Sequence, residues 1–175
     1  EMCIRDRRRD FKIADLNSSA PWVEMARGIN LKNVKNMAAQ RKISDEDMKK
    51  TQDLKSQGNS CFGKAQFEEA CEKYQEAIGV LNVTDPRHEH ADLSQVLWMN
   101  LAAAELKRSK HANALAASSN ALAFGPKAKA YYRRACAYEG MKQWSKACSD
   151  LKEALKLNPR DKSIKSKLNQ LKQKK

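Results

Sequence analysis

The chain has 175 residues, a formal net charge of +13 and a hydrophobic fraction of 41%. This length fits one domain with tails and leaves little room for a second full-sized fold. Six Gly and four Pro residues are too few for a loop-rich β-sandwich or a collagen-like protein. No apolar run reaches the roughly 18 residues of a membrane span, and the first ten residues lack an apolar secretory segment. Five cysteines without a CxxC pair indicate reduced thiols. We therefore expect a helical, cytoplasmic protein.

The first 50 residues show only weak patterning. Residues 1–15 are expected to be a disordered or artefactual N-terminus, because EMCIRDR resembles a translated sequencing adapter and the chain begins with Glu. We accordingly expect an incomplete chain. Residues 16–50 carry scattered apolar residues and predict a loosely helical N-terminal extension. Within them, Ser44 is a candidate N-cap, and the three acids that follow it favour a helix start through the helix dipole.

An internal repeat organises the rest of the chain. Three segments, about 51–94, 95–127 and 128–161, align so that small residues coincide in three columns, with spacings of 44 and then 33 residues. The columns are Gly58, Ala102 and Ala135; Ala70, Ala114 and Ala147; and Ala77, Ala121 and Ala154. Pro126 and Pro159 close the second and third segments. Small residues at fixed positions let two helices of one unit approach closely.

This pattern resembles the tetratricopeptide repeat (TPR), a helix-turn-helix unit of 34 residues. The resemblance covers residues 51–161 and implies an all-α, right-handed α-solenoid of three units. The first unit departs from the family because it lacks the terminal Pro. Residues 162–175 carry apolar residues at helical spacing among lysines, which predicts a basic C-terminal capping helix. The apolar positions of this helix are Ile164, Leu168 and Leu171.

The first spacing exceeds the second by 11 residues, which lie between the first and second units. A longer second helix and an enlarged loop would absorb this insertion. Thr84, Asp85 and Pro86 indicate a turn, and we expect Asp92 or Ser94 to cap the next helix. His88 and His90 raise the alternative of a metal site, but no third and fourth ligands are fixed, so an exposed polar loop is the prediction.

The first helix of each unit should carry the binding face. At about 100° per residue, positions 2, 5, 6, 9, 12 and 13 of a unit lie opposite its packing side, and stacked first helices line the concave surface of such a solenoid. These positions hold four cations, two asparagines and one acid. The residues are Lys55, Lys107, Lys129, Arg133, Asn59, Asn100 and Glu139. Converging ammonium, guanidinium and amide donors favour an extended anionic ligand, above all a chain-terminal carboxylate.

The same positions are similar to the carboxylate clamp of cochaperone TPR domains. The resemblance implies that Lys55, Asn59, Asn100, Lys129 and Arg133 hold the C-terminal Glu-Glu-Val-Asp of cytosolic heat-shock protein 90 or heat-shock protein 70. It further implies that Lys107 supports the peptide, and that Phe62 and Ala103 contact an apolar side chain upstream.

No catalytic, cofactor or metal-ligand pattern competes with this interpretation. A Gly-rich phosphate loop, an HExxH motif and a GxSxG motif are all absent. Cys136 lies on the groove face near cations that would lower its pKa, but it has no base partner, so we expect it to contact peptide. We expect a non-enzymatic peptide-binding module. One alternative is the regulatory TPR fragment of a larger enzyme, an immunophilin prolyl isomerase or a serine/threonine phosphatase.

Two further alternatives use the basic charge instead of the groove. Nucleic-acid binding through the basic C-terminal half would weaken steeply with salt. The Lys-rich helix at 162–175 has the composition of a calmodulin-binding or membrane-surface helix, although such a lysine face is usually only solvated.

Overall fold

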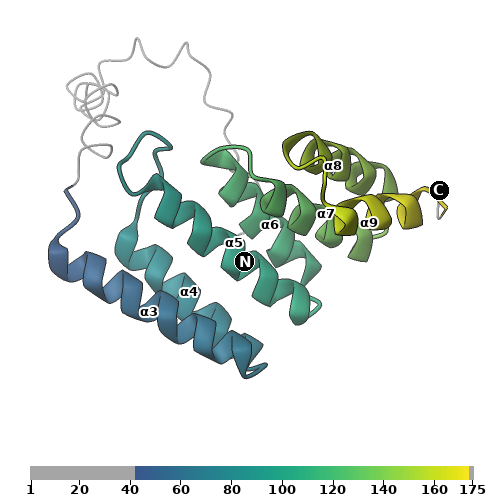
Figure 1. The fold of residues 1–175 in the computed structure, drawn as a ribbon. Coiled ribbons are helices and arrows are strands. Elements are labelled where there is room, and N and C mark those ends of the chain that lie inside the picture. The colour runs from purple at the N-terminus through teal and green to yellow at the C-terminus, as the bar shows by residue number, and fades with distance from the viewer. Residues whose placement is uncertain (1–41, 174–175) are drawn as a thin grey trace, which may run out of the picture. The chain divides into compact units, whose positions relative to one another are not determined.

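A computed structural model describes residues 42–173 of the chain, which fall in one compact unit. The described residues contain seven α-helices and no strand (Figure 1). The helices are α3 (Asp45–Gly63), α4 (Phe67–Leu81), α5 (Ala91–Lys107), α6 (His111–Ala123), α7 (Ala128–Gly140), α8 (Trp144–Leu157) and α9 (Lys162–Lys172). The predicted segment 1–15, and residues 16–41 of the predicted N-terminal extension, lie outside the described residues.

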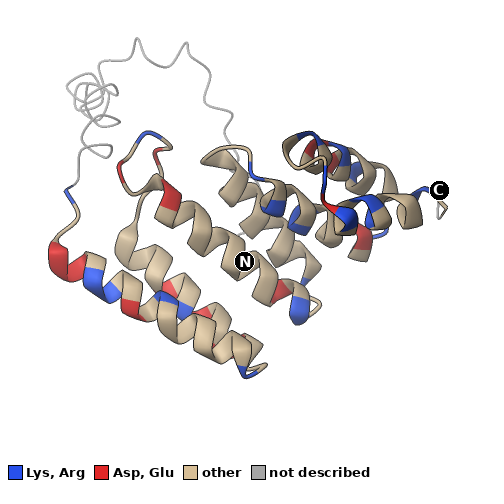
Figure 2. Cartoon of the chain, viewed as in Figure 1, with Lys and Arg blue, Asp and Glu red and all other residues tan. Residues whose placement is uncertain are grey.

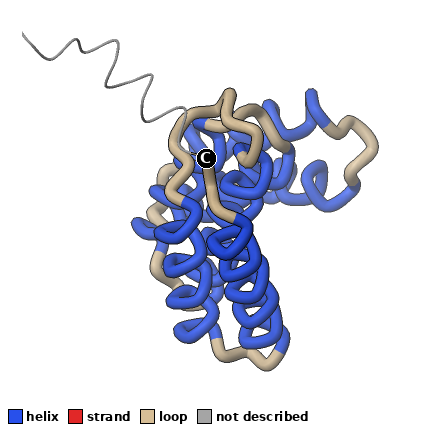
Figure 3. The backbone as a smooth tube through the Cα atoms, turned by 90° about the vertical axis from the view of Figure 1, so that its left-hand side faces the viewer, coloured by secondary structure: helices blue, strands red, loops and turns tan. Residues whose placement is uncertain are grey.

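The helices pack in sequence as antiparallel pairs. Helix α3 packs on α4, α5 on α6 and α7 on α8, and each pair also contacts the next through its neighbouring helices. Figure 3 shows these paired helices side by side, joined by short turns. Helix α5 additionally contacts α7, so the first helices of successive units lie along one side. The predicted all-α solenoid of helix-turn-helix units is confirmed.

The small-residue columns lie where helices approach most closely. All nine positions are buried, and the eight alanines are each 1% exposed or less. Gly58 shows why the smallest residue is needed: a Cβ atom there would lie 2.7 Å from the ring of Tyr74 on α4. Real Cβ atoms do not come that near a buried ring, so close packing of α3 on α4 requires glycine.

The turn inside each unit has the same backbone geometry three times. Ala65, Ser109 and Lys142 all have positive φ, between 58° and 62°. In each turn the following amide donates to a carbonyl five residues back, as from Lys110 N to Glu105 O at 2.9 Å. This is the Schellman arrangement, in which a left-handed residue ends a helix and satisfies its last carbonyls.

Helix α3 begins as the sequence predicts. Ser44 is its N-cap, and the Ser44 side chain accepts a hydrogen bond of 3.0 Å from Asp47 N. Asp45, Glu46 and Asp47 occupy the first turn, where negative charge is favoured by the helix dipole.

The insertion between the first two units forms loop 82–90, with an extra turn of helix at the start of α5. Helix α4 has 15 residues against 13 in α6 and 14 in α8, so the second helix is only slightly longer. The predicted turn is present, because Asp85 accepts from Arg87 N at 2.9 Å. The prediction that Asp92 or Ser94 caps the next helix is wrong.

The reason is that α5 starts at Ala91, directly out of the turn that precedes it, and no side chain caps it. The Ser94 hydroxyl is buried and donates instead to Val83 O at 3.2 Å. This hydrogen bond therefore connects loop 82–90 to the first turn of α5.

Helix α9 covers the end of the solenoid. Its apolar residues Ile164, Leu168 and Leu171 are buried against α7 and α8, together with Leu151 of α8. Asp161 caps the helix by accepting from two backbone amides. The remaining surface of α9 is lysine-rich (Figure 2). None of the helices in residues 42–173 combines the length and the apolar character needed to cross a bilayer.

Candidate functional site

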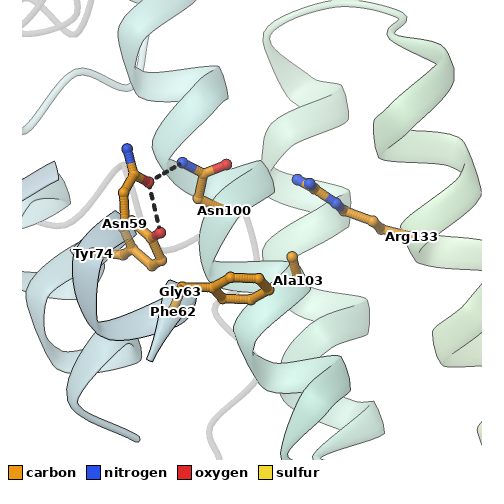
Figure 4. A pocket seen from close by; sticks show the side chains of 7 residues that line it. All are labelled: Asn59, Phe62, Gly63, Tyr74, Asn100, Ala103 and Arg133. Carbon is orange, nitrogen blue, oxygen red and sulfur yellow. Dashed lines mark hydrogen bonds between the residues drawn. The ribbon is translucent and has the colours of Figure 1, made fainter. Parts of the chain in front are cut away.

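A cavity of about 230 Å³ lies between the first helices of the three units, where five of the predicted site residues meet. Figure 4 shows the residues that line it. They are Asn59, Phe62, Gly63, Tyr74, Asn100, Ala103 and Arg133. These side chains span 75 positions of the sequence and come from α3, α4, α5 and α7. The repeat register therefore brings them to one place.

An amide pair stands at one side of the cavity. Asn59 Oδ1 accepts a hydrogen bond of 2.8 Å from the Tyr74 hydroxyl and a second, of 3.3 Å, from Asn100 Nδ2. Figure 4 draws both bonds converging on this one oxygen. The second bond joins α3 to α5 and so links the first unit to the second.

Arg133 is the positive charge of the cavity. Its guanidinium donates to the carbonyl of Met99 on α5. Burial lowers the pKa of Arg133, because a charged group loses solvation in the protein. An arginine nevertheless stays protonated, and no carboxylate of residues 42–173 pairs with it. The result is a partly desolvated cation that lacks an anionic partner within the described residues.

Three of the predicted site residues do not line the cavity. Lys55 is half-buried and lies one turn before Asn59 on α3. Lys129 is exposed and lies one turn before Arg133 on α7, while Lys107 is exposed at the last residue of α5. Within residues 42–173 none of the three forms an ion pair. Their ammonium groups are therefore not neutralised by a carboxylate of these residues.

Other cations, in contrast, are held by carboxylates of this chain. Arg134 binds Asp150 through two hydrogen bonds of 2.7 and 2.8 Å, which tie α7 to α8. Lys167 of α9 pairs at 2.5 Å with Glu139, the one acid among the predicted groove positions. The capping helix thus neutralises a charge that would repel an anionic ligand.

Sequence reasoning missed Tyr74, because only the first helix of each unit was expected to face the ligand. The ring of Tyr74 is 2% exposed and comes from the second helix, yet its hydroxyl reaches Asn59. One signal in the sequence was available: the first unit holds Tyr74 at the position where the other units hold Ser118 and Leu151, and it alone has glycine in the first small-residue column. In the structure, this large ring packs against Gly58, and its hydroxyl donates to Asn59.

The chemistry of the remaining polar groups does not suggest a nucleophile or a metal centre. Burial raises the pKa of the Cys136 thiol despite the nearby Lys167 and Arg133, so the expectation of a lowered pKa is wrong. In the part of the chain described, no three His, Cys, Asp or Glu side chains are grouped to hold a metal ion.

A second cavity, of about 330 Å³, lies beside the last turns of α4 and α6. We call it the loop-side cavity. It is lined by Ile78, Gly79, Asn82, Val83, Thr84, Trp98, Asn120, Ala123 and Phe124. No lysine, arginine, aspartate or glutamate lines it, so it offers no charge to an anionic ligand.

Comparison with known proteins agrees with this architecture. A family model of the tetratricopeptide repeat matches residues 128–161, the range that the repeat register gives to the third unit. The DnaJ homolog subfamily C member 7 homolog of Schizosaccharomyces pombe is 31% identical over 72% of this chain and 25% of its own length. The Hsp70-Hsp90 organising protein of Plasmodium falciparum is 31% identical over 69% of this chain and 44% of its own.

Solved structures give the same result. The first TPR domain of Spaghetti (RPAP3), bound to the HSP90 peptide SRMEEVD, superposes with a TM-score of 0.63 at 26% identity, covering 71% of this chain and 92% of that one. The second TPR domain of human RPAP3, in complex with the HSP70 peptide SGPTIEEVD, gives 0.64 at 25% identity, covering 72% and 98%.

The chain spans a quarter of the S. pombe relative and less than half of the Plasmodium one. The likeness therefore concerns the repeat domain and not the whole of those proteins. Residues 128–161 therefore match a tetratricopeptide repeat, and the described residues share the fold of tetratricopeptide-repeat domains.

Proposed function

We propose that residues 51–161, capped by 162–175, form a non-enzymatic cochaperone module that binds acidic C-terminal peptides. The ligand is the Glu-Glu-Val-Asp terminus of heat-shock protein 90 or heat-shock protein 70. Any catalysis by the parent protein would reside in residues of a longer chain. A cytoplasmic location is part of the proposal, because the resemblance concerns cytosolic chaperones.

The observation that carries this proposal is that Arg133 is partly buried and has no anionic partner among the described residues. A guanidinium that has lost solvation and has no carboxylate partner among residues 42–173 gains strongly from an incoming anion. Asn59 and Asn100 stand beside it in the same cavity. A terminal carboxylate there would receive charge-assisted and neutral hydrogen bonds together.

The flanking residues fit the rest of such a peptide. Lys55 and Lys129, one turn before Asn59 and Arg133, would contact side-chain carboxylates of the ligand. Lys107 would add charge at the end of α5. Phe62 and Ala103 line the cavity and would receive the apolar side chain of the ligand. Two neighbours with known structures were solved with peptides that end in Glu-Glu-Val-Asp, which supports the choice of ligand.

Isothermal titration with a Glu-Glu-Val-Asp peptide and with its C-terminal amide tests the proposal. A hydrogen bond to a charged group contributes about 1.5–3 kcal/mol. We therefore expect Arg133→Ala and Lys129→Ala each to weaken binding of the free-acid peptide roughly 10- to 100-fold. Lys152→Ala is the matched control, because Lys152 is an exposed cation on α8 outside the cavity.

Two outcomes would contradict the proposal. One is equal affinity of the wild-type protein for the free acid and the amide. The other is that the two groove variants bind no more weakly than Lys152→Ala, which would mean that the peptide senses only the overall positive charge.

A further inference from the structure

Asn59 is held in one orientation by two donors. Its Oδ1 atom accepts from the Tyr74 hydroxyl at 2.8 Å and from Asn100 Nδ2 at 3.3 Å. An amide that uses its oxygen twice must turn its NH₂ group the other way. In Figure 4 the Asn59 nitrogen lies on the side away from both bonds. This NH₂ group has no partner among residues 42–173, and Asn59 lines the cavity.

The packing of Tyr74 favours this orientation of the Asn59 amide. Its ring is buried between α3 and α4, with Gly58 leaving just enough space for it. Because the ring is enclosed in the core, its packing holds the hydroxyl next to Asn59. Burial raises the pKa of Tyr74, so the hydroxyl keeps its proton and remains a donor at physiological pH.

Without the hydroxyl, the Asn59 amide would lose its stronger anchor. An asparagine can then turn its oxygen toward the ligand, where it would face a carboxylate with an acceptor instead of a donor. The contact would change from attraction to repulsion between lone pairs. Affinity for the peptide with a free carboxylate would therefore fall, whereas affinity for the amidated peptide would change little.

We propose that Tyr74 is a positioning residue for carboxylate recognition, acting through Asn59 by holding its amide oxygen so that the NH₂ group stays free to donate to the ligand. The inference rests on the proposed function. It adds a residue of the second helix to the site and explains how one tyrosine can serve both the core of the first unit and its ligand selectivity.

Titration of Tyr74→Phe with the Glu-Glu-Val-Asp peptide and with its C-terminal amide tests this role. Phenylalanine keeps the ring against Gly58 and removes only the hydroxyl. We expect affinity for the free acid to fall about 3- to 10-fold, and affinity for the amide to change less than twofold. Tyr138→Phe is the control, since it removes a hydroxyl from a half-buried tyrosine outside the cavity.

A double-mutant cycle separates positioning from a structural effect. In an Asn59→Ala background, Tyr74→Phe should have no further effect on the preference for the free acid, because the residue through which it acts is gone. The inference is overturned if Tyr74→Phe leaves that preference unchanged, or if its effect persists in the Asn59→Ala background. A wild-type protein that does not prefer the free acid would instead overturn the proposed function itself.

Discussion

At the scale of single residues, the contact between Gly58 and Tyr74 connects the core of the first unit with the cavity. The hydroxyl of Tyr74 reaches Asn59 only because α3 lies close enough to α4, and that closeness requires glycine at position 58. The sequence predicted that Gly58 is buried but not what it faces. A helical wheel gives the direction of a side chain, whereas the hydrogen bond depends on how closely two helices approach.

Gly58→Ala tests this contact through stability. The new methyl group would press on a ring that cannot withdraw, and overpacking of this kind costs about 1–3 kcal/mol. We expect this cost to exceed the gain in helix propensity, so that the free energy of unfolding in urea falls. Gly79→Ala is the matched control, because a Cβ atom there meets nothing within 4 Å.

The control should gain about 0.5–1 kcal/mol, as expected when alanine replaces glycine inside an exposed stretch of helix. If both variants gained the same amount, the contact between position 58 and the Tyr74 ring would not limit the packing of α3 on α4.

At the scale of elements, the turns within the three units share one backbone conformation although their sequences differ. Ala65, Ser109 and Lys142 share one backbone conformation, although none is glycine, the usual residue at positive φ. The small-residue columns predicted the helix pairs on either side. They could not predict the turn geometry, because no glycine marks it, nor the start of α5, because its first turn carries no capping side chain.

Ser109→Gly should therefore stabilise the domain. A left-handed conformation costs an L-residue about 1–2 kcal/mol, and glycine removes that cost. Part of this gain in stability is offset, because glycine also gives the unfolded chain more conformational entropy. We expect the free energy of unfolding, measured by thermal denaturation, to rise by about 0.5–1 kcal/mol. Ser56→Gly makes the same substitution inside α3 and should destabilise instead. A loss of stability in Ser109→Gly would contradict the strain assigned to this turn.

At the scale of the whole molecule, the position of the charges matters more than their sum of +13. The register of the repeats was enough to predict that Asn59, Asn100 and Arg133 converge, because the same positions of the first helix face the same side in all three units. The pairing of Glu139 with Lys167 was not predictable, since the capping helix lies outside the repeats. Its effect is to neutralise the one acid among the predicted binding positions of the first helices.

We propose that the cavity between α3, α5 and α7 receives a terminal carboxylate. The most direct measurement is a titration of ¹⁵N-labelled protein with the Glu-Glu-Val-Asp peptide, followed through the side-chain NH₂ signals of Asn59 and Asn100 and the Nε–H signal of Arg133. Asn120 lines the loop-side cavity and provides an internal reference. We expect saturable shifts of the first three signals with the free acid, much smaller shifts with the amide, and none for Asn120. Shifts confined to Asn120, or equal shifts with both peptides, would show that this cavity does not bind the terminal carboxylate.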